Sequence, residues 1–261
     1  MNFKNRIIQV KNNFNSSLRG SDNTKVVVLG HQKSGTTVIA NLIAKSAELS
    51  YSNDPIYNTD KNSTRVLKYI YGDLPAFYNH VNKNKSKFFH NVVKDPDFSF
   101  SFQAVKELYP KSKYLFVERN PLDIIRSIFN RLGIDGRIDC KSIDGIPLKR
   151  GTEQWRYILN GDGSDDYTVI ERLSHRIETC MQIYKENEDE LILLKYEDFL
   201  LNKRAFIEGC CRTLNFPIKK DISGDVDTQF QPKGDAKVDP ESFFGKENYE
   251  KIISIGSFST L

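Results

Sequence analysis

A loop of anion-binding groups follows the first apolar run of the chain. Gly30 and Gly35 have the G-x4-G spacing of a nucleotide-phosphate loop, but the lysine stands at Lys33, and Thr36 occupies the lysine position of that motif. A strand that ends in such a loop and continues as a helix presents backbone N–H groups and a positive helix end to an anion. We therefore predict that this loop binds phosphate and differs from a Walker A loop.

Several donors near one helix start distinguish the loop from a plain glycine turn between a strand and a helix. The helix is predicted over residues 36 to 48, because apolar residues recur there at helical spacing. The donors are Lys33, Ser34, Thr36 and Thr37, and the apolar positions are Ile39, Leu42, Ile43 and Ala47. The combination favours an anion site over a simple turn.

A second group of anion-binding side chains follows a later apolar run. Residues 120 to 123 have the order of a helix start: Asn120 caps, a proline takes the first position and Asp123 returns a hydrogen bond to the cap. Arg119 then stands at a strand end, and Ser127 lies one turn beyond Asp123 on the same helix face. The two side chains are placed to hold one phosphate from two sides. The alternative is an ordinary capped helix whose Arg119 forms a salt bridge.

Short apolar runs supply the elements that position these groups. Each run is followed by a polar turn and then by a helical pattern. This alternation of strand, turn and helix is typical of an open parallel sheet, which binds its ligands at the carboxyl ends of the strands. The expected strands are Val26 to Leu29, Phe88 to Val93, Tyr114 to Val117 and Leu191 to Leu194. We predict an α/β fold, namely a P-loop-like three-layer α/β/α domain with a central parallel sheet.

Length and composition indicate one domain. The chain has 261 residues, 39% of them hydrophobic, and we assign all of it to a single domain with residues 1 to 20 as an N-terminal extension. The net charge of +4 comes from 38 basic and 34 acidic residues without a polybasic tract, so a small anionic ligand is expected and nucleic acid is not.

Cysteine usage and the N-terminus point to a cytoplasmic protein. None of the four cysteines (Cys140, Cys180, Cys210 and Cys211) forms a C-x-x-C pair, and we expect reduced thiols in the core and no metal site. Residues 1 to 20 contain no apolar run long enough for a signal sequence or a membrane span. If the chain is complete, it is expected in the cytoplasm without a membrane partner.

The two motifs together resemble those of the sulfotransferase family that uses 3′-phosphoadenosine 5′-phosphosulfate (PAPS). The family's Lys-Ser-Gly-Thr-Thr appears as residues 33 to 37, and its Arg-Asn-Pro-x-Asp-x-x-x-Ser appears as residues 119 to 127, with a weaker third match at residues 194 to 198. The resemblance is to a soluble, bacterial-type member. It implies transfer of a sulfuryl group from PAPS, with 3′,5′-adenosine bisphosphate (PAP) as product.

The resemblance also implies residue roles. It assigns Lys33, Ser34, Gly35, Thr36 and Thr37 to the 5′-phosphosulfate, and Arg119 with Ser127 to the 3′-phosphate. Tyr196 matches a tyrosine that lies near the adenine in some members, although a strand-end aromatic in the core is an equal alternative. Lys233 and Gly234 are similar to a late loop over the 3′-phosphate, but such a pair is usually only part of a loop.

The catalytic base is where the chain departs from the family. A lysine matches at Lys94, which is expected to contact the sulfuryl group or the leaving oxygen, but the histidine of cytosolic members is missing. Lys33 is expected to neutralise the leaving phosphate. Asp95, Asp97 and His90 remain as bases, each expected near the same strand end, with Asp95 first because it adjoins Lys94.

The acceptor is expected to be a small molecule, such as a natural product or sugar, that receives the group on a hydroxyl or an amine. Its pocket is predicted from the region 51 to 78, the turn at Lys94, and a Gly- and Asp-rich lid over residues 133 to 167 with a short helix near Trp155. Aromatic side chains that either pack on the acceptor or belong to the core are Tyr51, Tyr57, Tyr69, Tyr71, Phe77 and Tyr78. The oligomeric state stays open.

Two other classes of protein share such a strand and loop. A P-loop kinase or NTPase uses an acid at a strand end, here Glu118 or Asp198, to hold its metal. In that class, however, a lysine directly precedes the hydroxyl residue, and in this chain Thr36 occupies the position of that lysine. A non-catalytic nucleotide-binding protein on the same fold is the second alternative, because the family's histidine is absent.

Overall fold

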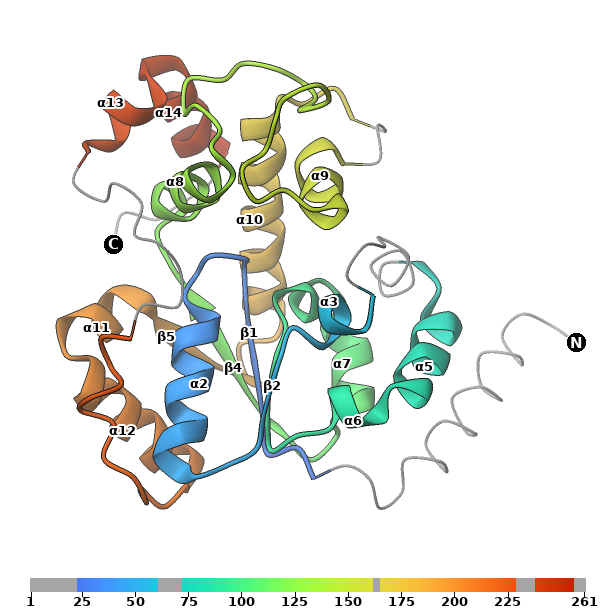
Figure 1. Cartoon of the computed structure of the whole chain (residues 1–261), viewed down its shortest axis with the longest axis vertical. Helices are drawn as coiled ribbons and strands as arrows, with labels where there is room; N and C mark the ends of the chain where they lie inside the picture. Colours follow the sequence, from blue (N-terminus) through green and yellow to red (C-terminus); the bar gives the residue numbers. More distant parts are fainter. Residues whose placement is uncertain (1–22, 61–71, 162–164, 229–237, 256–261) are drawn as a thin grey trace, which may run out of the picture.

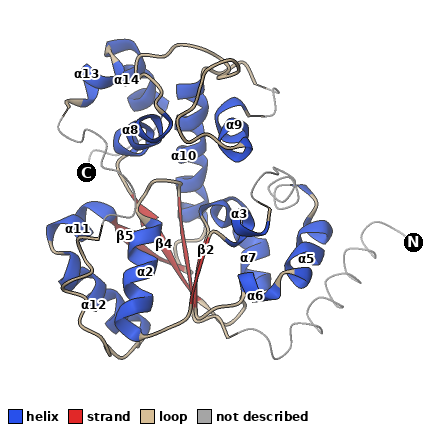
Figure 2. Cartoon of the chain, viewed as in Figure 1, coloured by secondary structure: helices blue, strands red, loops and turns tan. Residues whose placement is uncertain are grey.

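Five parallel strands form the central sheet of the protein. The computed structural model describes residues 23–60, 72–161, 165–228 and 238–255. The strands lie in the order β2-β3-β1-β4-β5, and every pairing is parallel. Figures 1 and 2 show the sheet between its helices. They are β1 (Val26–Gly30), β2 (Tyr51–Asn53), β3 (Val92–Lys94), β4 (Lys113–Glu118) and β5 (Leu191–Lys195). The predicted parallel sheet is confirmed, with β1 at its centre.

Two strands differ from the sequence prediction. The expected strand from Phe88 to Val93 is wrong in its first four residues, because β3 begins only at Val92 and Phe88 ends the short helix α6 (Lys85–Phe88). Phe88 is buried among the rings of Phe77 and Phe98. Aromatic residues suit a strand and a helix end in the core equally well, so composition did not separate them. The polar strand β2 was not predicted because it has no apolar run.

Helices cover both faces of the sheet, as predicted for three layers (Figure 1). Alternate residues of β1 point to opposite faces, so that Val27 and Leu29 enter one core cluster and Val26 and Val28 enter the other. The first face is covered by α3 (Pro55–Thr59), α5 (Leu74–Lys83), α6, a 3-10 helix η1 (Pro96–Ser101), α7 (Phe102–Leu108) and part of α10 (Val169–Glu186). The second is covered by α2 (Thr36–Ala47), α11 (Tyr196–Leu201) and α12 (Lys203–Leu214).

A third group of helices lies beyond the carboxyl ends of the strands, at the top of Figure 1. Their apolar faces form a separate cluster with α10 at its centre. The group consists of α8 (Pro121–Leu132), α9 (Glu153–Asn160), α10, α13 (Pro240–Phe244) and α14 (Lys246–Ile255). This arrangement places α8 and α9 above the edge of the sheet where ligands bind in open parallel sheets.

The described helices are too short or too polar to cross a membrane, and the cysteines are unpaired. None of the described helices combines the length and the apolar character needed to cross a bilayer. All four cysteines are free thiols, and Cys180, Cys210 and Cys211 are buried, as expected for reduced cysteines in the core.

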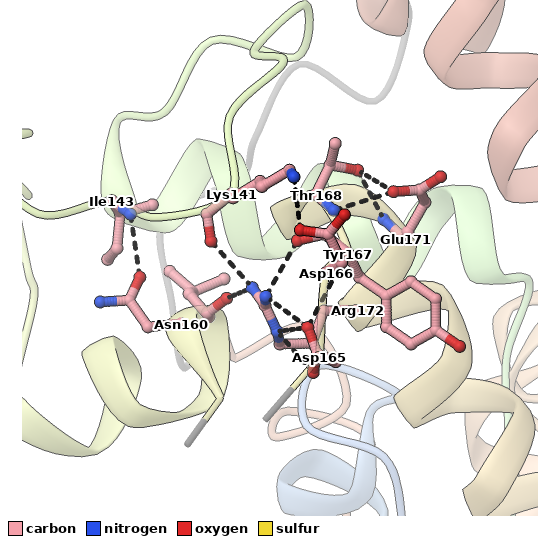
Figure 3. Close-up of polar contacts among 10 residues, drawn as sticks. Lys141, Ile143, Asn160, Asp165, Asp166, Tyr167, Thr168, Glu171 and Arg172 are labelled. Carbon is pink, nitrogen blue, oxygen red and sulfur yellow. Dashed lines mark hydrogen bonds and ion pairs between the residues drawn. The ribbon is translucent and has the colours of Figure 1, made fainter. Parts of the chain in front are cut away.

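Arg172 in α10 anchors the segment that carries α9 (Figure 3). Its guanidinium donates to the Asp165 carboxylate at 2.7 Å and to the carbonyl oxygens of Leu159 at 2.6 Å and Tyr167 at 2.9 Å. The Leu159 carbonyl belongs to the last turn of α9, whose C-terminal carbonyls have no partner within the helix. One buried side chain therefore fixes the end of α9 and the start of α10 together.

We predict that Arg172→Met lowers the free energy of unfolding by about 2–4 kcal/mol, because it leaves buried carbonyl groups and a carboxylate without their donor. The matched control is Arg204→Met, whose arginine is exposed and pairs with Glu208, and which should cost about 0.5 kcal/mol or less. Urea denaturation of the two variants measures the difference. Equal losses of stability would contradict the anchoring role.

Candidate functional site

One pocket of about 680 Å³ opens at the carboxyl ends of the strands. Both sequence motifs contribute to its wall. The lining residues that follow β1 and β4 are Gln32, Lys33, Gly35, Thr36, Thr37, Val38, Arg119, Ser127 and Arg131. Further walls come from the Asp54–Tyr57 region, residues 94–97, α9, and the α11–α12 region with residues 226–228. A size of several hundred Å³ is typical of small-molecule sites.

The backbone of the loop after β1 is held in an unusual conformation. Gly35 has φ +98° and Lys33 has φ +71°, both in the left-handed region. A Cβ atom added at Gly35 would lie 2.2 Å from the ring of Tyr196, so that ring packs directly against the peptide backbone. Only glycine combines this φ with so close an approach. The first turn of α2 is thereby presented to the pocket, as the sequence predicted.

The hydroxyl groups of the loop differ in their access to the pocket, because Thr36 and Thr37 line it and Ser34 lies beneath its surface. Ser34 is fully buried, and its Oγ atom has no hydrogen-bond partner among the residues that the structure describes. Thr36 and Thr37 start α2 and line the pocket. A buried hydroxyl without a partner is costly, and an oxyanion at the start of α2 would satisfy it. The loop therefore fits the phosphate group expected there.

Arg119, the first residue of the second motif, contacts the loop of the first motif. It donates to the carbonyl oxygen of Lys33 at 2.8 Å, and its guanidinium is 4.6 Å from the centre of the Tyr196 ring. Its Nε atom is buried without a hydrogen-bond partner in the described part of the chain. The described contacts therefore place Arg119 in the pocket wall with Ser127, and not in the salt bridge of the alternative interpretation.

Of the two hydrogen bonds predicted at the helix start after Arg119, the structure contains one. The side chain of Asn120 accepts from the Leu122 N–H, which confirms the cap. The predicted return bond from Asp123 is wrong, because Asp123 accepts from Arg126 on the same helix. The Asn120 N–H is bound instead by the carboxylate of Glu197 at 3.0 Å, from a helix 77 residues away. Sequence spacing shows only local partners, so this contact was not visible.

The cations around the loop influence one another. Burial and the positive charges of Arg131, Arg119 and Lys94 lower the pKa of Lys33 to about 7 from its usual 10.5. A lysine in this state gains its proton readily when an anion arrives, because the anion offsets both causes. The site is therefore prepared for a negatively charged ligand.

The opposite wall contains a buried lysine and the first of two buried acids. Lys94 is only 3% exposed, and its ammonium group pairs with Asp54 at 2.7 Å. Asp95 accepts from two backbone N–H groups, those of Ile56 at 3.0 Å and Asp97 at 3.1 Å. Burial and the nearby carboxylates of Asp97 and Asp54 raise the pKa of Asp95. Asp95 therefore joins η1 to α3 in addition to lining the pocket.

Asp97 connects several elements at the pocket. Its Oδ1 atom accepts from Gln32 at 2.7 Å and from Arg176 at 3.0 Å, and its Oδ2 atom accepts from Gln154 at 2.9 Å. Gln32 directly precedes Lys33, and Gln154 belongs to α9. These two glutamines were not recognised in the sequence, because nothing in their spacing links residues 32, 97 and 154. Asp97 thus joins the phosphate loop to the wall formed by α9.

His90 is not near this pocket. It precedes β3, at the amino end of the strand, and its imidazole bonds to the Ser86 carbonyl. The expectation that His90 lies at the same strand end as Asp95 is therefore wrong, because residues before and after a strand lie at opposite edges of the sheet. His31 is closer to the loop, but burial lowers its pKa to about 3, which makes it a poor proton acceptor.

The aromatic residues separate into wall and core. Tyr57 lines the pocket together with Trp155, whereas Phe77 and Tyr78 belong to a core cluster. Tyr51 packs against the core on the other face of the sheet. Tyr69, Tyr71, Lys233 and Gly234 lie outside the described residues. Tyr196 packs on Gly35 and lines the pocket, so it is more than a core aromatic.

Comparisons with known proteins agree with the motifs. The family model described as the sulfotransferase domain matches residues 23–233. The chain therefore belongs to the sulfotransferase family. No curated protein sequence matches the chain.

Several solved sulfotransferases resemble the fold. One from Alicyclobacillus acidocaldarius is 13% identical over 89% of this chain and 95% of its own, with a TM-score of 0.46. One from Mycobacterium tuberculosis is 10% identical over 94% and 80%, with a TM-score of 0.48. A mouse sulfotransferase complexed with PAP is 13% identical over 78% and 63%, with a TM-score of 0.44.

The metal-dependent alternative finds no support in the pocket that the structure describes. Glu118 and Asp198, the two acids assigned to a metal in that alternative, are not among the residues that line it. The described ranges contain no group of three His, Cys, Asp or Glu residues arranged to hold a metal ion.

We predict that binding of PAP takes up close to one proton at pH 8, because the phosphate charge favours the protonated form of Lys33. Affinity should then fall as the pH rises above about 7, where free Lys33 is neutral. Lys33→Arg stays charged across this range and should show neither effect. Calorimetric titrations in buffers of different ionisation enthalpy count the protons. Equal uptake by both proteins would contradict the assignment to Lys33.

Proposed function

We propose that the protein transfers a sulfuryl group from PAPS to a hydroxyl or an amine of a small-molecule acceptor. The observation that carries the proposal is the single pocket in which the phosphate loop and Arg119 face a second wall formed by Lys94, Asp97 and α9. A pocket with an anion site at one end and a buried carboxylate at the other suits transfer of an anionic group to a nucleophile that must lose a proton.

The residues at the loop end fit the donor. The Oγ atom of Ser34 and the Nε atom of Arg119 are both buried without a hydrogen-bond partner among the described residues. Each could therefore donate a hydrogen bond to an oxyanion. In the proposal, residues 33 to 37 hold the 5′-phosphosulfate, and Arg119 with Ser127 holds the 3′-phosphate. The Tyr196 ring beside Gly35 then offers a stacking surface for the adenine.

Lys33 is the side chain that we assign to the negative charge that develops on the leaving phosphate. When bound, PAPS supplies a sulfuryl group attached to a phosphate that leaves as the bond breaks. The ammonium of Lys33 and the backbone donors of the loop neutralise the charge on that phosphate without a large rearrangement. In the proposal Lys94, which lines the pocket and pairs with Asp54, contacts the transferred group.

Asp97 is the acid that the geometry favours as the base, ahead of Asp95. The Gln32 contact ties Asp97 to the phosphate loop, and the Gln154 contact ties it to the acceptor wall. Both carboxylates accept hydrogen bonds at both oxygens, but the donors to Asp95 are backbone N–H groups that shape the turn, whereas those to Asp97 are side chains that can rearrange when an acceptor binds. We assign to Asp97 the role of accepting the hydrogen of the acceptor's O–H or N–H group, and to Asp95 a mainly structural role.

The cellular setting is also part of the proposal. Three of the four free cysteines are buried and none is paired, which supports a reducing compartment. We therefore place the protein in the cytoplasm, acting on a small soluble acceptor. In this proposal the whole chain is one domain, and the segment from 133 to 167, with Trp155 and Gln154 in the pocket wall, covers the acceptor.

The proposal predicts that PAPS and a panel of alcohols, phenols and amines yield PAP in the presence of the protein. Lys33→Ala should lower kcat by about 100 to 1000-fold, because it removes a donor to the leaving oxygen. Arg119→Ala should mainly weaken PAP binding, by about 10 to 100-fold. Chromatography of PAP and calorimetric titration measure the two effects. Tight PAP binding without any product would favour a non-catalytic nucleotide-binding protein instead.

The two acids can be separated by matched substitutions. We predict that Asp97→Asn lowers kcat by about 100-fold or more with little change in PAP affinity, since general bases contribute factors of this size. Asp95→Asn should mainly lower the melting temperature and leave most of kcat. Steady-state kinetics and thermal melting of both variants make the comparison. The reverse pattern would restore Asp95 as the base.

A further inference from the structure

Arg131 has no described partner although it lies in the pocket wall. It follows Ser127 by one turn of α8, so the two side chains share a helix face and both line the pocket. Arg131 is half-buried, and its Nε atom is fully buried. Among the described residues, none forms a hydrogen bond or an ion pair with it. A half-buried guanidinium whose buried Nε atom has no partner is unfavourable, and an anion in the pocket would satisfy it.

Other cations of the pocket are already engaged. Lys94 pairs with Asp54, and Lys203 pairs with Asp227. Arg119 donates to the backbone of the phosphate loop and stacks on Tyr196. Lys33 belongs to the phosphate loop itself. Arg131 is therefore a positive charge beyond those that the proposed donor site accounts for.

The charge of Arg131 acts on Lys33 of the loop, and other groups around Arg131 lie on the side of the pocket that we assign to the acceptor. Arg119 lies at the end formed by Tyr196 of α11, whereas the groups whose charge acts on Arg131 include Tyr57 and Asp54, at α3. Figure 1 shows α11 and α3 on opposite sides of α2. Trp155 of α9 also lines the pocket and packs in the same apolar cluster as α8.

We propose that Arg131 binds an anionic group of the acceptor, so that the natural acceptor is a small molecule bearing a carboxylate or a phosphate in addition to its reactive hydroxyl or amine. This inference rests on the proposed function, because it assigns the acceptor of that reaction. The guanidinium fork suits both groups, which it can bind through two parallel hydrogen bonds.

Selectivity follows from the same geometry. A neutral acceptor would leave the buried Nε atom of Arg131 without an anion, and an active site discriminates against a substrate that leaves a buried polar atom unpaired. We expect acids to be preferred over their neutral counterparts by about 10 to 100-fold in kcat/KM, the effect of one charge-assisted pair. Trp155 would contact the remaining, less polar part of the acceptor.

The first experiment compares related acceptors with and without an anionic group. The pairs are 4-hydroxybenzoate, 4-aminobenzoate and glucuronate, each with its methyl ester, and glucose 6-phosphate with glucose. With PAPS as donor, at least one acid should exceed its neutral partner in kcat/KM by about 10-fold or more. Arg131→Gln should remove this preference and weaken binding of the acids more than binding of PAP, because Arg131 is assigned to the acceptor.

A control variant and a binding measurement complete the design. Arg150→Gln removes an exposed cation near Arg131 that does not line the pocket, and it should keep the preference for acids. Thermal melting shows whether each variant is folded. In the protein saturated with PAP, the acids should raise the melting temperature more than the esters do, and Arg131→Gln should abolish the difference. This readout needs no turnover.

The outcomes separate the inference from the proposed function. Failure to bind PAP or to form it from PAPS would overturn the proposed function. Formation of PAP with equal use of acids and neutral partners would overturn only the role of Arg131. The same holds if Arg131→Gln weakens PAP binding as much as acid binding, since Arg131 would then serve the donor. Absence of any stabilisation by the acids would also overturn it.

Discussion

The contact between the Tyr196 ring and the Gly35 backbone is the constraint on which the site depends. It leaves no room for a side chain at position 35, and it sets the direction in which the first turn of α2 meets the pocket. The same ring packs on Arg119, which in turn holds the Lys33 carbonyl. These residues follow three neighbouring strands, β1, β4 and β5, so the order of the sheet brings them together. The loop geometry is therefore a property of the whole sheet edge.

Concentrated positive charge is the second feature of this edge. Lys33, Arg119 and Arg131 lie around one pocket, and their mutual repulsion together with burial disfavours the protonated form of Lys33. Such an arrangement opposes stability unless negative charge is supplied. An anion bound in this pocket would offset both causes of the lowered Lys33 pKa.

Asp97 gives the pocket its connection between the two ends. It holds Gln32 beside the phosphate loop and Gln154 on α9, while Arg176 from α10 balances its charge. Helix α9 is fixed from its other end by Arg172 (Figure 3). The wall opposite the phosphate loop is therefore held by buried polar contacts at both ends of one short helix. This precision is what a transfer reaction between two bound molecules requires.

The sequence by itself determined the class of fold, the glycine loop after β1 and the capped helix after Arg119, because apolar runs, glycine spacing and capping residues act locally. It also carried the family motifs. Only the tertiary structure placed Gln32, Asp97 and Gln154 together, and only it removed His90 from the site. Those contacts join residues far apart in the chain, such as 32 and 97, and depend on which strand ends share an edge. Local patterns carry no information about such distances.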